Sequence, residues 1–190
     1  MKDKNYWNGF YSNNPGEMER DPSAFLKDHI DSLRKGKAID VACGAGRNSL
    51  LLAEKGFSVE AMDFSDVAIS KAVTRSTAEG KSIEFKTMSL DFYLAPIQKY
   101  DTIIAVDYKC IPRLIDEIKK GLVIGGTFLV EAYTYNHLKN NPKTEMETDE
   151  CYKSFELANI LSRGWNLLYY DERVINGESK ARAIAIKPSY

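Results

Sequence analysis

Asp40-Val41-Ala42-Cys43-Gly44-Ala45-Gly46-Arg47-Asn48 closes a short apolar run at residues 37–39 and leads into a leucine-rich run at 50–52. This order predicts a buried strand, a tight turn and the first turn of a helix. Glycine at positions 44 and 46 permits a positive φ and lets a ligand approach the backbone without a Cβ in the way. Because the free N–H groups of the helix start face the same place, the stretch predicts a binding loop for a nucleotide-type ligand.

From residue 37 onward, β-rich runs alternate with helix-patterned runs. Strands are expected near residues 37–42, 57–62, 82–87, 101–106 and 126–133, and helices near 47–55, 66–79 and 111–120. Gly56 and Gly80 end two of these helices, and Ser65 caps one. Such alternation is typical of a doubly wound α/β fold, in which helices cover both faces of a mainly parallel sheet.

The pattern changes near residue 150. The polar stretch 136–150 is expected to be a long loop, and residues 154–162 a short helix. Two extended runs, 165–170 and 180–186, are joined by Asn176-Gly177, the strongest short signal for a β-hairpin, with a loop of two or more residues. We therefore expect a seven-stranded, mostly parallel sheet that ends in an antiparallel hairpin.

The length of 190 residues suits a single domain over residues 1–190. Residues 36–190 carry the alternating pattern and form the expected ligand-binding core. Residues 1–35 are rich in aromatic side chains, among them Trp7, Phe10 and Tyr11, and are expected to form an N-terminal arm or lid.

Charge and composition exclude several classes of protein. The 26 Lys and Arg are offset by 27 Asp and Glu, so no nucleic acid partner is expected. The apolar runs are far shorter than the roughly 20 residues of a membrane span. Residues 1–7 lack the apolar core of a signal peptide, and three widely spaced cysteines fit reduced thiols, so a cytoplasmic location is expected. His29 and His137 are the only histidines and neither lies near a cysteine pair, so no metal site is expected.

The glycine loop has two further explanations. A dinucleotide-binding loop, G-x-G-x-x-G, would have a third glycine where Ser49 stands. It also requires no acid at Asp40, whose carboxylate inside the strand suits a ligand with a positive end. A phosphate-binding P-loop fails because G-x-x-x-x-G-K-[ST] does not occur in the chain. A nicotinamide-dependent oxidoreductase stays open as a minor alternative.

The stretch from Asp40 to Gly46 resembles the first motif of the class I S-adenosylmethionine-dependent methyltransferases, an acidic residue followed by roughly G-x-G-x-G at a strand-to-helix turn. Ala42 departs from the commonest form, which has glycine there. With Arg47-Asn48 and the leucine-rich helix that follows, the loop is most similar to the small tellurite-resistance-type and thiopurine-type methyltransferases. The resemblance implies a Rossmann-like fold, S-adenosylmethionine as cofactor and S-adenosylhomocysteine as product.

Later motifs extend the resemblance to about residues 37–187. Asp63, at the end of the second strand, is implied to accept from the ribose hydroxyls, and Asp91 from the adenine amino group. Trp7 and Tyr11 in the arm are expected to close over the sulfonium, whose charge an aromatic face stabilises. The predicted cofactor contacts are Asp40, Ala42, Cys43, Gly44, Gly46, Arg47, Asn48, Asp63, Phe64, Leu90, Asp91, Phe92, Val106, Trp7 and Tyr11.

The acceptor is expected to be a small molecule, such as a thiol, a metalloid oxyanion or another heteroatom nucleophile. Soft acceptors need little proton abstraction, whereas an oxygen or nitrogen acceptor would need a base, with Asp107 and His137 as candidates. Tyr108, at the end of the fourth strand, is a third catalytic candidate and a candidate for the acceptor pocket. Tyr133 and Tyr135, at the end of the fifth strand, are expected to line the same pocket. The alternatives are a non-catalytic S-adenosylmethionine-binding module and a nucleic-acid or protein methyltransferase. The expected assembly is a monomer or a weak homodimer.

Overall fold

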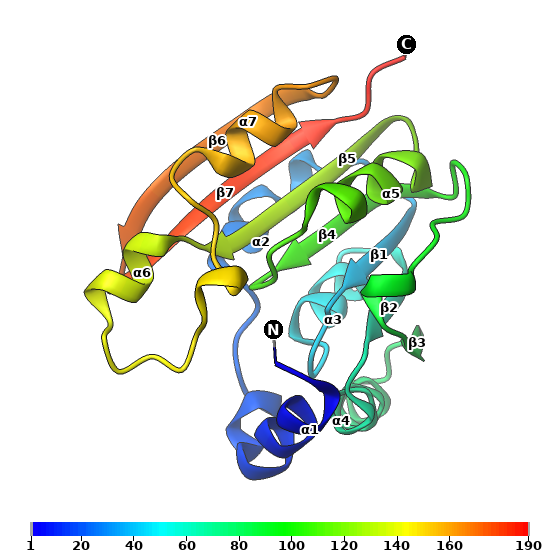
Figure 1. Cartoon of the computed structure of the whole chain (residues 1–190). Coiled ribbons are helices and arrows are strands. Elements are labelled where there is room, and N and C mark those ends of the chain that lie inside the picture. Colours follow the sequence, from blue (N-terminus) through cyan, green and yellow to red (C-terminus); the bar gives the residue numbers. More distant parts are fainter. Residues whose placement is uncertain (1, 190) are drawn as a thin grey trace.

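Seven strands form one mixed sheet in the order β3-β2-β1-β4-β5-β7-β6 in the computed structural model, which describes residues 2–189 (Figure 1). Strands β1 to β5 pair in parallel, and β7 runs antiparallel to both β5 and β6. The strands are β1 Lys37–Val41, β2 Ser58–Asp63, β3 Ile83–Thr87, β4 Tyr100–Val106, β5 Leu122–Tyr133, β6 Asn166–Ile175 and β7 Glu178–Ile186. The predicted fold class, a Rossmann-like doubly wound sheet ending in an antiparallel hairpin, is confirmed.

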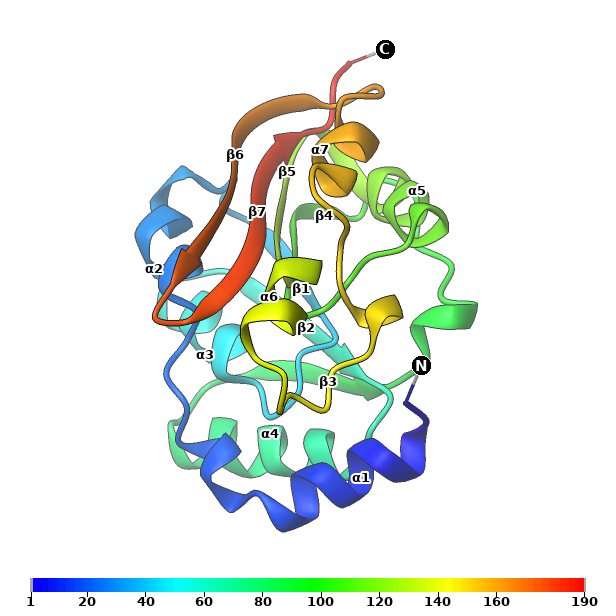
Figure 2. The ribbon, with the colours of Figure 1, turned by 60° about the vertical axis from the view of Figure 1, so that its left-hand side comes forward.

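Helices cover both faces of this sheet, with α5 and α7 on one side and α2 and α3 on the other (Figures 1 and 2). The α-helices are α1 Lys4–Asn13, α2 Ala24–His29, α3 Arg47–Glu54, α4 Asp66–Ala78, α5 Pro112–Gly121, α6 Tyr135–Asn140 and α7 Glu156–Leu161. The short 3-10 helices are η1 Pro15–Met18, η2 Ile30–Ser32, η3 Leu90–Phe92 and η4 Thr148–Glu150. The predicted positions of the helices that become α3, α4 and α5 agree with the structure to within two residues.

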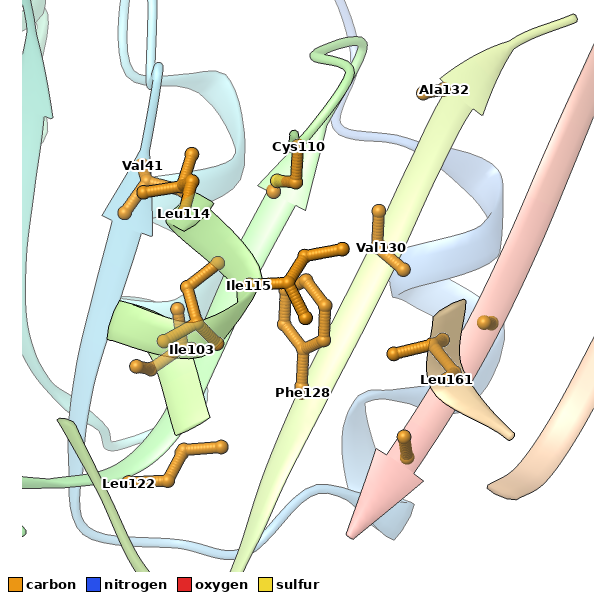
Figure 3. Packing of buried hydrophobic residues seen from close by; sticks show 14 of the residues in the cluster. Val41, Ile103, Cys110, Leu114, Ile115, Leu122, Phe128, Val130, Ala132 and Leu161 are labelled. Carbon is orange, nitrogen blue, oxygen red and sulfur yellow. The ribbon is translucent and has the colours of Figure 1, made fainter. Parts of the chain in front are cut away.

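The core follows the alternation of side chains along the central strands. Ile103 of β4 and Phe128 of β5 face the layer of α5 and α7, where they pack with Ile115 and Leu161 (Figure 3). The next residue of β4, Ile104, faces the opposite layer of α2 and α3. Because successive side chains of a strand point to opposite faces, each central strand stabilises two cores, with about 1.5–3 kcal/mol for each large apolar side chain that is fully buried.

The terminal hairpin has the tight loop that Asn176-Gly177 favours. Strand β6 ends at Ile175 and β7 begins at Glu178, so the loop is two residues long. Both loop residues have a positive φ, 51° at Asn176 and 80° at Gly177, as a type I′ turn requires. The twist of this turn matches that of the two strands. Both strands therefore continue closer to the turn than predicted: β6 ends at Ile175 rather than near residue 170, and β7 begins at Glu178 rather than near residue 180.

The stretch 136–150, expected to be a long loop, contains α6 and η4 instead. Helix α6 has only six residues, too few to leave a periodic pattern in the sequence. Tertiary contacts hold it: the Tyr135 N–H donates to the Tyr152 carbonyl, and the Asn141 side-chain amide donates to the carbonyls of His137 and Gly177. The expectation of a loop was wrong because two of these partners, Tyr152 and Gly177, lie outside the stretch and are brought to it by folding.

The N-terminal arm divides into two parts. Helix α1 lies alongside α4 (Figure 2), where Asn8 Oδ1 accepts from the Ser65 hydroxyl at 2.7 Å. Helix α2 instead contributes Phe25 and Leu26 to the core on its face of the sheet. Within the arm, α1 and the residues on either side of it, rather than α2, therefore cover the carboxyl ends of the strands. Between residues 2 and 189, no helix combines the length and apolar character needed to cross a membrane.

Ala42 provides a test of the glycine loop, because it is an alanine with a φ of 57°. A left-handed conformation is costly for a residue with a Cβ, so we expect Ala42→Gly to raise the free energy of unfolding by about 0.5–1 kcal/mol. Urea denaturation followed by circular dichroism measures this. The control is Ala38→Gly in β1, where the added backbone freedom should destabilise the protein. A loss of stability in both variants would contradict the prediction.

Candidate functional site

A cavity of about 450 Å³ lies beyond the carboxyl ends of β1, β2 and β4. Strands β2 and β3 lie on one side of β1, and the chain then returns to place β4 on its other side. Ligands of open α/β sheets bind where the strand order reverses in this way. Its floor comes from residues 42–45, 47–48, 63–64, 88–91 and 106–109. The rest of the wall comes from α1, residues 144–146 and 149–150, and the side chains of Lys2, Glu17, Arg20, Tyr133 and His137.

The two glycines of the loop have different structural roles. Gly44, with a φ of 55°, lines the cavity, and a Cβ there would lie only 2.4 Å from the hydroxyl oxygen of Tyr11. Gly46, with a φ of 81°, lies behind the cavity, where a Cβ would come within 3.0 Å of the Ala72 Cβ. Gly44 thus keeps the backbone open beneath Tyr11, whereas Gly46 lets the loop pack against α4.

Asp63 braces this loop from the end of β2. Its Oδ2 accepts from the Gly44 N–H at 3.0 Å, and its Oδ1 accepts from the Ser65 N–H at 2.9 Å. Burial raises the pKa of the Asp63 carboxyl, although these backbone donors act in the opposite direction. Each carboxylate oxygen has a second lone pair, so the same group can also accept from a ligand in the cavity.

Asp40 lies behind the loop and does not line the cavity. Its side chain is almost fully buried, and the Ser49 hydroxyl donates to Oδ2 at 2.6 Å. The other oxygen, Oδ1, has no hydrogen-bond partner among the described residues. Burial raises the pKa of Asp40 to about 7, because a low-dielectric site disfavours the charged form.

Only some of the adenine contacts predicted in the segment after β3 line the cavity. Leu90 and Asp91, in η3, line the cavity with Phe64. Phe92 does not, because its side chain is 85% exposed on the outer surface of the turn. A three-residue helical turn points adjacent side chains in different directions, which the sequence did not reveal.

At the other end of the cavity, Asp107 follows β4 with a φ of 60°. Its carboxylate is 2.6 Å from Arg47 Nη2, 2.8 Å from Lys180 Nζ and 3.7 Å from Arg20 Nη2. Burial acts to raise the pKa of Asp107, but Lys180 and Arg47 outweigh it and the pKa lies below its usual value. A carboxylate held charged by three cations is a weak proton acceptor.

Behind Asp107 lies a row of buried charges that the sequence reading missed. Lys180 also contacts Glu131 at 3.0 Å, and Arg182 contacts Glu131 at 3.3 Å. Each of these three residues is at most 5% exposed, so each charge needs its partners to offset the loss of water. A glutamate within the apolar run of β5, and two cations at alternate positions of β7, were the available signals.

His137 and two tyrosines line the same end. The His137 ring lies 4.5 Å from the Tyr133 ring, and burial lowers the pKa of the imidazole, which leaves it neutral near pH 7. Burial raises the pKa of Tyr108, so its hydroxyl keeps its proton. Of the predicted bases, His137 is thus better suited than Asp107 to accept a proton.

The structure brings most predicted site residues into this one cavity. The predicted residues that line it are Trp7, Tyr11, Ala42, Cys43, Gly44, Arg47, Asn48, Asp63, Phe64, Leu90, Asp91, Val106, Asp107, Tyr108 and His137. Tyr133 lines it as well, whereas Asp40, Gly46, Phe92 and Tyr135 do not. Residues that sequence reasoning did not place there include Lys2, Tyr6, Arg20, Glu145 and Glu150.

Residues 1–182 match the family model of the tellurite resistance protein TehB. The chain belongs to the TehB family. Over 103 residues it is 31% identical to a probable S-adenosyl-L-methionine-dependent methyltransferase, TehB of Haemophilus influenzae. That alignment covers 50% of this chain and 35% of the relative, so the chain spans about a third of that protein's length.

Two solved structures illustrate the fold. The crystal structure of Haemophilus influenzae TehB superimposes with a TM-score of 0.69 at 20% identity, over 87% of this chain and 62% of that one. Magnesium protoporphyrin IX methyltransferase of Synechocystis, crystallised with bound SAH, gives a TM-score of 0.73 at 16% identity over 97% of both chains. At these identities the similarity establishes the shared fold.

Proposed function

We propose that this TehB-family protein is an S-adenosylmethionine-dependent methyltransferase that acts on a small molecule. One observation carries the proposal: the open backbone at Gly44, the carboxylates of Asp63 and Asp91, and the strand end at Asp107 and Tyr108 all line a single cavity. The names of the Haemophilus influenzae relative and of the Synechocystis enzyme support the same chemistry.

The residues present fit this cofactor. Asp63 would accept from the ribose hydroxyls, and Asp91 from the adenine amino group, with Leu90 and Phe64 against the ring. The methionine part would pass beside Gly44. Asp40, buried behind this loop, would attract the ligand ammonium group through its charge without touching it. The cofactor supplies a methyl group on a positively charged sulfur, and the chain must align and desolvate the acceptor.

The chain's own residues favour this reaction in two ways. Trp7, Tyr11 and Tyr108 give the cavity aromatic walls, which exclude water and stabilise a nearby positive charge. Helix α1 brings the first two, and it acts as the lid that the aromatic arm predicts. A thiolate or metalloid oxyanion needs no base here. For an oxygen or nitrogen acceptor, the neutral imidazole of His137 would receive the proton.

The purified chain is expected to bind the cofactor and to transfer its methyl group. S-adenosylhomocysteine and S-adenosylmethionine should both bind saturably in calorimetry. S-adenosylhomocysteine should then be released when thiols, thiopurines, selenite and tellurite are tested as acceptors. Absence of cofactor binding would exclude the proposal, while binding without turnover on any acceptor would favour a non-catalytic module. The cytoplasmic location and the monomeric or weakly dimeric state stay predictions.

A further inference from the structure

One cation in the cavity has no part in the function proposed so far. The ammonium group of Lys2 lies 4.7 Å from the ring centroid of Tyr6 and 5.8 Å from that of Trp7. It also lies 3.3 Å from Glu150 Oε2. A carboxylate and two aromatic faces are the groups that bind organic ammonium ions in proteins.

This arrangement differs from an ordinary surface ion pair. The side chains of Lys2 and Glu150 are only 10% and 14% exposed. By comparison, the side chains of Lys4, in α1, and of its partner Asp66, in α4, are 45% and 59% exposed. Burial acts to lower the pKa of Lys2, but Glu150 outweighs it and the pKa lies above its usual value, so the amine stays charged.

The groups around this cation are held in place without it. The Tyr6 and Trp7 rings meet edge to face at 5.5 Å, and the Tyr6 hydroxyl donates to Glu145 at 2.8 Å. Glu150 accepts from the Glu147 N–H at 2.7 Å, which fixes it on η4. Lys2 itself precedes α1, whose N-cap is Asp3, so its side chain can move away without unwinding the helix.

We propose that Tyr6, Trp7 and Glu150 form a subsite for the protonated amine of the methyl acceptor, and that Lys2 fills it until the acceptor binds. This inference rests on the proposed methyltransferase function and narrows its substrate class to amine-bearing acceptors. The subsite lines the same cavity as the cofactor contacts at Gly44 and Asp63, as the site for an acceptor must.

The first test measures the subsite without any reaction. The probe is n-butylammonium, with n-butanol as its neutral counterpart, and binding is followed by calorimetry and by tryptophan fluorescence, to which Trp7 contributes beside the buried Trp165. Lys2→Gln removes the built-in competitor, so it should bind the ammonium about tenfold more tightly than the wild type. Adding Glu150→Gln to that variant should cancel the gain. Lys4→Gln, which makes the same charge change at an exposed pair, should leave the affinity unchanged.

The second test uses acceptors that share a thiol and differ in charge: cysteamine, 2-mercaptoethanol and 3-mercaptopropionate. In wild-type protein, kcat/KM should be highest for cysteamine, and Glu150→Gln should lower its ratio to 2-mercaptoethanol about tenfold. Equal ammonium affinities in the wild type, Lys2→Gln and the double variant, in protein that binds S-adenosylhomocysteine, would overturn the subsite and leave the methyltransferase function standing. A protein that binds the ammonium as expected but no cofactor would instead overturn the proposed function.

Discussion

Replacing Asp63 by alanine is expected to weaken S-adenosylhomocysteine binding about 100-fold, which corresponds to about 2.7 kcal/mol. The carboxylate accepts from the N–H groups of Gly44 and Ser65, so its loss leaves two buried donors unpaired and loosens the loop under the cofactor. The free energy of unfolding should fall by about 3 kcal/mol, since a hydrogen bond to a charged group contributes about 1.5–3 kcal/mol. Calorimetry and urea denaturation measure the two effects.

Two further variants separate the binding role of Asp63 from its structural role. Asp63→Asn keeps the shape but turns an amide group toward one of the backbone donors, so it should lose both stability and affinity. Asp66→Asn makes the same change at an exposed partner of Lys4 and should leave the stability nearly unchanged, because water screens an exposed ion pair. If Asp63→Ala lost stability but kept its affinity for the cofactor product, Asp63 would only brace the loop.

Replacing Asp40 by asparagine is expected to change stability and binding in opposite directions. The pKa of Asp40 is about 7 in the folded protein, against a usual value of 3.8. Because the folded-state pKa is raised, the stability that the protonated carboxyl contributes is fully present below pH 4. It is lost as the pH rises through 7, and the loss over about three pH units is on the order of 4 kcal/mol.

Asp40→Asn should therefore be more stable than the wild type at pH 8, and its stability should vary less between pH 4 and 7. It should also bind S-adenosylhomocysteine more weakly at pH 8, because the ligand ammonium group loses the attraction of a negative charge buried behind the loop. Urea denaturation across this pH range and calorimetry at pH 8 test both effects. Ser49→Ala serves as the matched variant, since losing the hydroxyl that donates to Asp40 should raise the pKa of Asp40 further and extend the loss of stability to higher pH. Parallel pH profiles for wild type and Asp40→Asn would contradict the prediction.

The predicted site residues show where local sequence is informative. The loop after β1 and the acid at the end of β2 lie at the cavity, and the sequence could place them at strand ends because strand and turn patterns extend over only a few residues. Phe92 was expected in the site, yet it is exposed, because the direction of a side chain in a short turn depends on what packs around it. Gly46 was expected to meet the ligand and instead packs against α4.

The sequence by itself determined the order of the strands and of helices α3, α4, α5 and α7, the glycine loop and the hairpin turn at Asn176-Gly177. These features depend on hydrophobic period and on the φ angles that glycine and asparagine tolerate, which are local properties. Only the tertiary structure decided that Lys180 and Arg47 hold Asp107 charged, that Asp40 has an oxygen without a partner, and that Tyr6 meets Glu145 across 139 residues. Charge and protonation depend on burial and on neighbours brought together by folding, and no local pattern records them.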